Sequence, residues 1–103
     1  MLDIRIYYSA LRFLSRHNSD VLKQYWLKEV TRKEKFSWID LPKRIKGRRK
    51  YFLFWWRLAN EMYATGNKSE KKNAKRINSR LKDRFGVEIM LGAKIGKGLH
   101  IPH

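Results

Sequence analysis

Apolar residues recur at steps of three and four along the N-terminal part of the chain. The first such stripe consists of Ile4, Tyr7, Tyr8, Leu11 and Leu14. This spacing places its members on one face of a helix. Asn18, Ser19 and Asp20 follow, and their side-chain oxygens are suited to accept the free amide hydrogens at a helix start. A second helix is therefore predicted from these residues to about Val30, with Trp26 on its apolar stripe.

The aromatic segment YFLFWWRLANEMYATG, from Tyr51 to Gly66, predicts the third main helix. Apolar residues occupy two neighbouring faces of it: Phe52, Trp55, Trp56, Ala59 and Tyr63 on one, and Phe54, Leu58 and Met62 on the other. So broad an apolar arc indicates a helix that is buried on two sides. Gly66 is the expected end of this helix, because glycine tolerates a positive φ. The helical spacing of the aromatic residues favours a packed core or a contact between protomers over base stacking.

A strongly basic segment comes next, and it predicts a further helix. Ser69 is the expected N-cap, and the helix is expected to end at Phe85 with Gly86 as its stop. Its apolar residues form one narrow stripe: Ala74, Ile77, Leu81 and Phe85. We therefore expect this helix to rest on the remainder of the fold by one thin face.

After Gly86 the period of the pattern changes to six residues. Three registers share this period: Ile89, Ile95 and Ile101; Val87, Ala93 and Leu99; and Gly92 and Gly98. The period fits neither an amphipathic helix nor an alternating strand, but it fits a parallel β-helix with aliphatic residues inside and glycines at the corners. The predicted fold class is mainly α: a helical N-terminal region over 1–66, a basic linker helix over 67–86, and the first, truncated coil of a parallel β-helix over 87–103.

The segment GVEIMLGAKIGKGLHIPH, preceded by FWWRLANEMYATG and NAKRINSRLKDRF, resembles a known family. It is similar to serine O-acetyltransferases and their capsular-polysaccharide relatives among the hexapeptide-repeat acyltransferases. The resemblance covers residues 54–103 and implies a left-handed coil in a trimeric, cytoplasmic enzyme, at the inner face of the membrane in some relatives. It implies acetyl transfer from acetyl-CoA, a co-substrate and not a prosthetic group, to a hydroxyl of serine or a cell-surface sugar.

In that family a histidine acts as general base, because a hydroxyl is a poor nucleophile until its proton is removed. The family pattern G-L-x-I-x-H is matched by Gly98 to His103, so the resemblance assigns the base to His103 and leaves His100 at a variable position. Glu88, 15 residues before His103, stands where the family has an aspartate that orients the base. Glutamate is one methylene longer, and this departure favours an acceptor other than serine.

The family pattern continues past the position of His103 with a Gly-Ile-Val-Ile stretch and further coils, which form the acetyl-CoA cleft between protomers. One coil cannot bury its own open edge, and repeat architectures need about three or more units for stability. Little or no catalysis is therefore expected from this chain alone. A natural truncation, a designed fragment and a frameshifted gene all remain open as explanations.

The charge balance opens two other classes of function. The chain has 25 Lys and Arg against nine Asp and Glu, a net charge of +16, which attracts phosphates, anionic lipids and acidic polymers. The basic runs lie at Lys43 to Lys50 and Lys68 to Arg84. The main alternative is thus a small basic helical module that binds nucleic acid or an anionic membrane surface without catalysis. A role in assembly, with helices that mediate homo-oligomerisation, is a third hypothesis.

Several kinds of chemistry are excluded or disfavoured by composition. The chain has no cysteine, so disulfides, thiolate nucleophiles and cysteine metal clusters are excluded. His100 and His103 alone leave the coordination of a metal ion incomplete, and no metal site is expected. The longest apolar run, Tyr51 to Trp56, has six residues, against the ~20 that a membrane-spanning helix needs. No signal-peptide pattern is found at the N-terminus.

Overall fold

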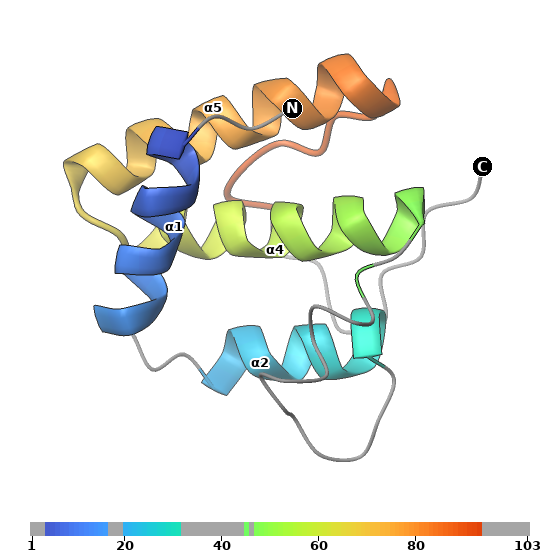
Figure 1. The fold of residues 1–103 in the computed structure, drawn as a ribbon, viewed down its shortest axis with the longest axis horizontal. Coiled ribbons are helices and arrows are strands. Elements are labelled where there is room, and N and C mark those ends of the chain that lie inside the picture. Colours follow the sequence, from blue (N-terminus) through green and yellow to red (C-terminus); the bar gives the residue numbers. More distant parts are fainter. Residues whose placement is uncertain (1–3, 17–19, 32–44, 46, 94–103) are drawn as a thin grey trace.

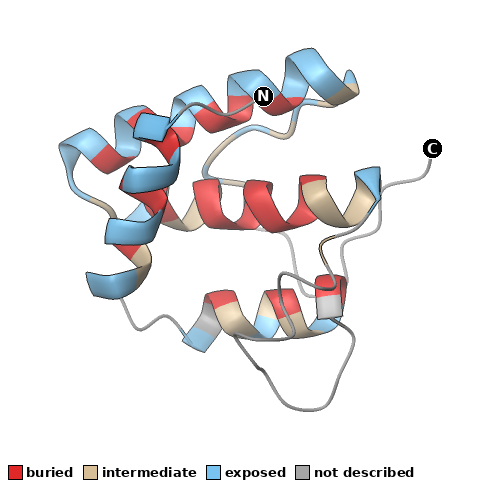
Figure 2. Cartoon of the chain, viewed as in Figure 1, coloured by how far each residue is buried: buried red, intermediate tan, exposed pale blue. Residues whose placement is uncertain are grey.

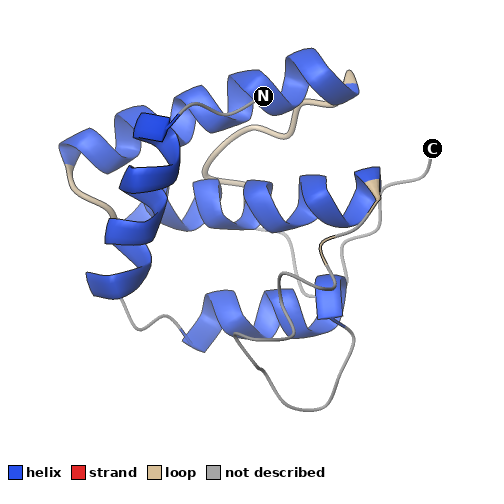
Figure 3. Cartoon of the chain, viewed as in Figure 1, coloured by secondary structure: helices blue, strands red, loops and turns tan. Residues whose placement is uncertain are grey.

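A computed structural model describes residues 4–16, 20–31, 45 and 47–93, most of which form helices around a shared apolar core (Figure 1). The elements are α1 (Ile4–Arg16), α2 (Asp20–Trp26), the π-helical turn η1 (Leu27–Thr31), α4 (Arg48–Thr65) and α5 (Lys68–Phe85). Within these ranges there is no strand (Figure 3). The second predicted helix is confirmed by α2 and η1, and the two later ones by α4 and α5.

Helix α4 is the centre of the fold. It contacts α5 on one side and α1, α2 and η1 on others, and every residue from Phe52 to Ala59 is buried (Figures 1 and 2). Trp26 stacks on Phe54 with 4.6 Å between ring centroids, and its Nε1–H donates to the Phe54 carbonyl oxygen at 3.3 Å. The prediction of a helix buried on two sides is therefore confirmed, and the aromatic residues of α4 pack in the core.

Helix α1 forms where the spacing predicts it, but a different face is buried. Ile6, Ala10 and Phe13 are at most 3% exposed, whereas Ile4 and Leu11 of the predicted stripe are 81% and 66% exposed. Apolar residues occupy both sides of this helix, so spacing alone does not identify the face that packs. The buried side also carries the small residues Ser9 and Ala10, which let α1 approach α5 closely.

The turn between α4 and α5 depends on a glycine for a reason other than the predicted one. Gly66 ends α4, but its φ is −76°, which any residue can adopt. A Cβ at this position would lie 2.8 Å from Glu70 Cβ and would also clash with the Met62 carbonyl oxygen. Lack of space beside the last turn of α4 and the first turn of α5, and not a positive φ, therefore demands glycine here. Gly86, by contrast, ends α5 with φ +69°, as predicted.

The N-cap of α5 is Asn67, and the prediction of Ser69 is wrong. Asn67 Oδ1 accepts from the Glu70 amide at 2.9 Å, and the Glu70 carboxylate accepts from the Asn67 amide at 2.9 Å. This reciprocal pair is a capping box, which satisfies two amide groups that the helix leaves free. Residue 69 then falls within the first turn of the helix.

The predicted fold class is wrong at its C-terminal part, because the described residues after α5 form no β-helical coil. Residues 87–93, the described part of the predicted coil, form no strand. Val87, Ile89, Leu91 and Ala93 are instead half-buried against the helical core, and the residues between them are exposed. A parallel strand needs a neighbouring strand for its amide and carbonyl groups. Here the helices supply both the apolar surface and the hydrogen-bond partners.

Candidate functional site

Glu88, the first of the two catalytic residues that the family resemblance assigns, lies in the segment 87–93, directly after α5. The middle of this segment is fixed by two side chains from different helices. Trp56 Nε1–H of α4 donates to the Ile89 carbonyl oxygen at 3.0 Å, and Asn78 Nδ2–H of α5 donates to the same oxygen at 3.2 Å. Trp56 is fully buried and Asn78 nearly so, and their positions are therefore set by the core. The path of the segment follows from helix packing.

The end of the segment is held by Asn60 of α4. Asn60 Nδ2–H donates to the Ala93 carbonyl oxygen at 3.1 Å, while Asn60 Oδ1 accepts from the Gly92 amide at 2.7 Å. Residues 90–93 form a turn, in which the Ala93 amide donates to the Met90 carbonyl oxygen at 3.2 Å. Gly92 has φ +94°, a conformation that favours glycine. One side-chain amide thus does what a neighbouring strand would do for two backbone groups.

Glu88 projects from this segment into solvent. The residue is exposed, and the part of the chain that the structure describes gives its carboxylate no ion pair or hydrogen bond. His103 and His100 lie outside the described residues. The predicted pairing of Glu88 with His103 therefore stays a prediction, and the structure locates only its acidic member.

The N-terminal end of α4 is basic and aromatic. Tyr51 contacts Phe85 with 6.0 Å between ring centroids, and Arg84 lies 5.8 Å from the centre of the Tyr51 ring. Burial, followed by the charge of neighbouring Tyr7, raises the pKa of the Tyr51 phenol above its usual 10.0, although Arg84 acts in the opposite direction. The Tyr51 hydroxyl is therefore a neutral donor at physiological pH.

The described ranges contain neither a metal-binding cluster nor a membrane-spanning helix. They hold no group of three or more His, Asp or Glu side chains that could bind a metal ion. They also include no helix with the length and apolarity needed to cross a bilayer.

Comparisons with models of known protein families, with curated proteins and with solved structures find no match to this chain. Of the side chains that hold the segment, Trp56 was expected in the core without a partner for its indole N–H, and Asn60 and Asn78 were not selected from the sequence. Asn60 interrupts the apolar arc of α4, and Asn78 adjoins the stripe residue Ile77. A polar amide at the border of a buried helix face needs a partner, and this is the signal that could have identified both.

Proposed function

We propose that this chain belongs to an acetyl-CoA-dependent O-acetyltransferase that acts on a hydroxyl of serine or of a cell-surface sugar. One structural observation supports this best: the α4 and α5 pair holds residues 87–93 and leaves Glu88 exposed. The segment leads toward the G-L-x-I-x-H pattern at Gly98 to His103. The helices would thereby set the direction from which the catalytic motif is presented.

The proposed chemistry is general-base catalysis by His103. Its imidazole takes the proton of the acceptor hydroxyl while the oxygen attacks the thioester carbonyl carbon of acetyl-CoA. The carbon–sulfur bond then breaks, and the proton passes to the leaving CoA sulfur. Glu88 would orient the imidazole and stabilise its protonated form. We place the reaction in the cytoplasm, where acetyl-CoA is available, and we propose a homotrimer that shares the acetyl-CoA cleft.

The test is an assay of thiol release on the full open reading frame that contains this chain. Acetyl-CoA is supplied with serine in one series and with cell-surface sugars in the other. We expect His103→Asn to reduce turnover by about 10²-fold or more, and Glu88→Gln to reduce it less. His100→Asn is the matched control, because His100 lies at a variable position of the pattern. Equal loss in both histidine variants, or no thiol release from the parent, would reject the proposal.

A second candidate is binding of an acidic polymer, and the lysines of α5 favour it. Lys68, Lys71, Lys72 and Lys75 line a shallow depression together with Tyr63, and the outer face of α5 is exposed (Figure 2). The described tryptophans, Trp26, Trp55 and Trp56, are buried, so they are not available to stack on bases and this mode would rest chiefly on the charge of α5. The test is a titration with single-stranded nucleic acid at several salt concentrations. A logarithm of the binding constant that falls linearly with the logarithm of salt concentration, without acetyl-CoA turnover, would support this candidate over the enzyme.

A further inference from the structure

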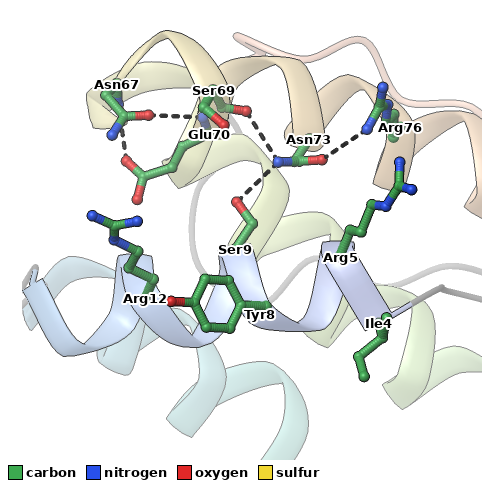
Figure 4. Close-up of a pocket in the computed structure, with 10 residues that line it drawn as sticks. All are labelled: Ile4, Arg5, Tyr8, Ser9, Arg12, Asn67, Ser69, Glu70, Asn73 and Arg76. Carbon is green, nitrogen blue, oxygen red and sulfur yellow. Dashed lines mark hydrogen bonds between the residues drawn. The ribbon is translucent and has the colours of Figure 1, made fainter.

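A groove of about 580 Å³ lies between α1 and α5 (Figure 4), and no residue of the segment 87–93 lines it. Helix α1 contributes Arg5, Ser9 and Arg12 to it, and α5 contributes Glu70, Asn73 and Arg76. The two helices touch through their small and polar residues, and the longer side chains extend along the groove. The site is therefore built from two elements whose relative position is fixed by the core.

The groove is positively charged and incompletely neutralised. It is lined by three arginines and one carboxylate, and that carboxylate, Glu70, already pairs with Arg16 outside the groove. Arg5 and Arg12 have no carboxylate partner among the described residues, and Arg76 bonds only the neutral Asn73 Oδ1 at 3.4 Å there. Figure 4 places Arg5 and Arg76 at the same end of the groove, one from each helix. A bound anion would relieve their mutual repulsion.

A buried hydroxyl provides an independent indication of a ligand. Asn73 Nδ2–H donates to Ser9 Oγ at 3.1 Å, and the two residues are only 8% and 9% exposed. Ser9 Oγ is thus occupied as an acceptor, and its own proton finds no acceptor within the described part of the chain. Buried donors are normally paired. In Figure 4 the Ser9 hydroxyl lies between the helices, beside Asn73 and within the groove.

We propose that this groove binds a phosphomonoester group between Arg5 and Arg76, with the Ser9 hydroxyl as a further donor. Guanidinium groups from two directions and a hydroxyl can serve three oxygens, which a phosphate presents and a carboxylate does not. The group can come from a soluble phosphorylated compound or from a lipid headgroup. The inference does not depend on acetyl transfer, because the groove shares no residue with the segment that carries Glu88.

The test is a titration of the chain with inorganic phosphate at constant ionic strength, followed by the amide chemical shifts of α1 and α5. Arg5→Gln and Arg76→Gln should each weaken binding about tenfold, the loss of one charge-assisted contact. Arg80→Gln is the matched control, because it removes the same charge from an exposed position of α5 that does not line the groove. It should change the affinity by less than about twofold. All three positions are exposed, so folding is not at risk.

A variant of opposite sign sharpens the test. Among the described residues that line the groove, Glu70 alone is negatively charged, and Glu70→Gln removes that charge but keeps an oxygen for the capping box. Phosphate should therefore bind this variant more tightly than the parent. Equal weakening by Arg80→Gln and Arg76→Gln, no saturable phosphate binding, or no gain in Glu70→Gln would each overturn the proposal.

A second titration distinguishes a lipid headgroup from a soluble phosphorylated compound as the source of the phosphate. Phosphatidylcholine vesicles that contain phosphatidic acid are compared with vesicles that contain phosphatidylserine, which has a phosphodiester. Preference for phosphatidic acid that is lost in Arg5→Gln and Arg76→Gln assigns the group to a lipid. Saturable binding of free phosphate without such a preference assigns it to a soluble compound.

Discussion

The Glu29 carboxylate and the Arg57 guanidinium face each other inside the core with almost no access to water. Arg57 Nε donates to Glu29 Oε1 at 2.8 Å and Arg57 Nη2 donates to Glu29 Oε2 at 2.6 Å, while the two side chains are 0% and 2% exposed. The guanidinium also lies 3.9 Å from the centre of the Tyr25 ring. Such a pair offsets its own desolvation only while both charges are present.

Removing one of these charges should be costly. We expect Glu29→Gln to lower the free energy of unfolding by about 3–5 kcal/mol, because the buried Arg57 guanidinium would lose the carboxylate that pairs with it. Urea denaturation followed by circular dichroism measures the change. Asp83→Asn removes an exposed carboxylate from α5 and should stay within about 0.5 kcal/mol of the parent. A loss as small in Glu29→Gln would show that the pair contributes little.

Tyr51 gives the fold a dependence on high pH. Burial raises its phenol pKa above 10.0, so the folded state favours the neutral form. The resulting stabilisation is complete below pH 10 and is lost as the pH rises through the folded-state pKa. The difference in unfolding free energy between the parent and Tyr51→Phe should therefore be constant below pH 10 and move in favour of Tyr51→Phe as the pH rises above 10. A difference that stays constant above pH 10 would contradict the assignment.

Gly66 ends α4 and Gly86 ends α5, and alanine should destabilise the fold at each for a different reason. The backbone angle φ makes Gly86 the more sensitive position, whereas the space around the residue makes Gly66 the more sensitive one. Gly86 has φ +69° and open space around a Cβ, whereas Gly66 has an ordinary φ and no room. We expect Gly86→Ala to cost about 1 kcal/mol. Gly66→Ala should cost about 2–3 kcal/mol, because the clash involves backbone that cannot move aside easily. Thermal unfolding of both variants provides the ranking, and the reverse order would mean that φ decides.

Helix positions could be predicted from the sequence more completely than helix faces. The apolar arc of α4 and the αL glycine after α5 are local features, and both predictions are confirmed. The buried face of α1 depends on which side fits against α5, and this involves Asn73, a residue far away in the chain. The cap at Asn67 was missed because Ser69 is an equally good capping residue by type. Local chemistry does not distinguish the two.

The six-residue period identified residues 87–93 as aliphatic and regular, but it did not identify their partner. Ile89 and Ala93 bond to side chains of α4 and α5, which the repeat pattern does not contain. The arginine groove was missed for a similar reason. Arg5 and Arg12 lie outside the two basic runs of the sequence, and only the packing of α1 on α5 brings them to the same groove as Arg76.

The charge of the whole molecule opposes its own folding. With a net charge of +16, positive side chains are brought closer together as the chain folds, and salt screens this repulsion. Raising sodium chloride from about 20 mM to about 500 mM should therefore stabilise the fold by about 1 kcal/mol, or roughly 5 °C in Tm. Differential scanning calorimetry measures the shift. A fall in Tm with salt would instead mean that ion pairs such as Arg16 with Glu70 dominate.

The hydrogen bonds of Asn60 close a loop whose ends are 32 residues apart in sequence, and the whole of α5 lies within that loop. A helix enclosed in this way cannot peel away from α4 as an independent unit. Its departure must also release the Gly92 and Ala93 backbone groups from Asn60. These two hydrogen bonds of Asn60 therefore couple local opening of α5 to release of the segment that follows it, and the two behave as one cooperative unit.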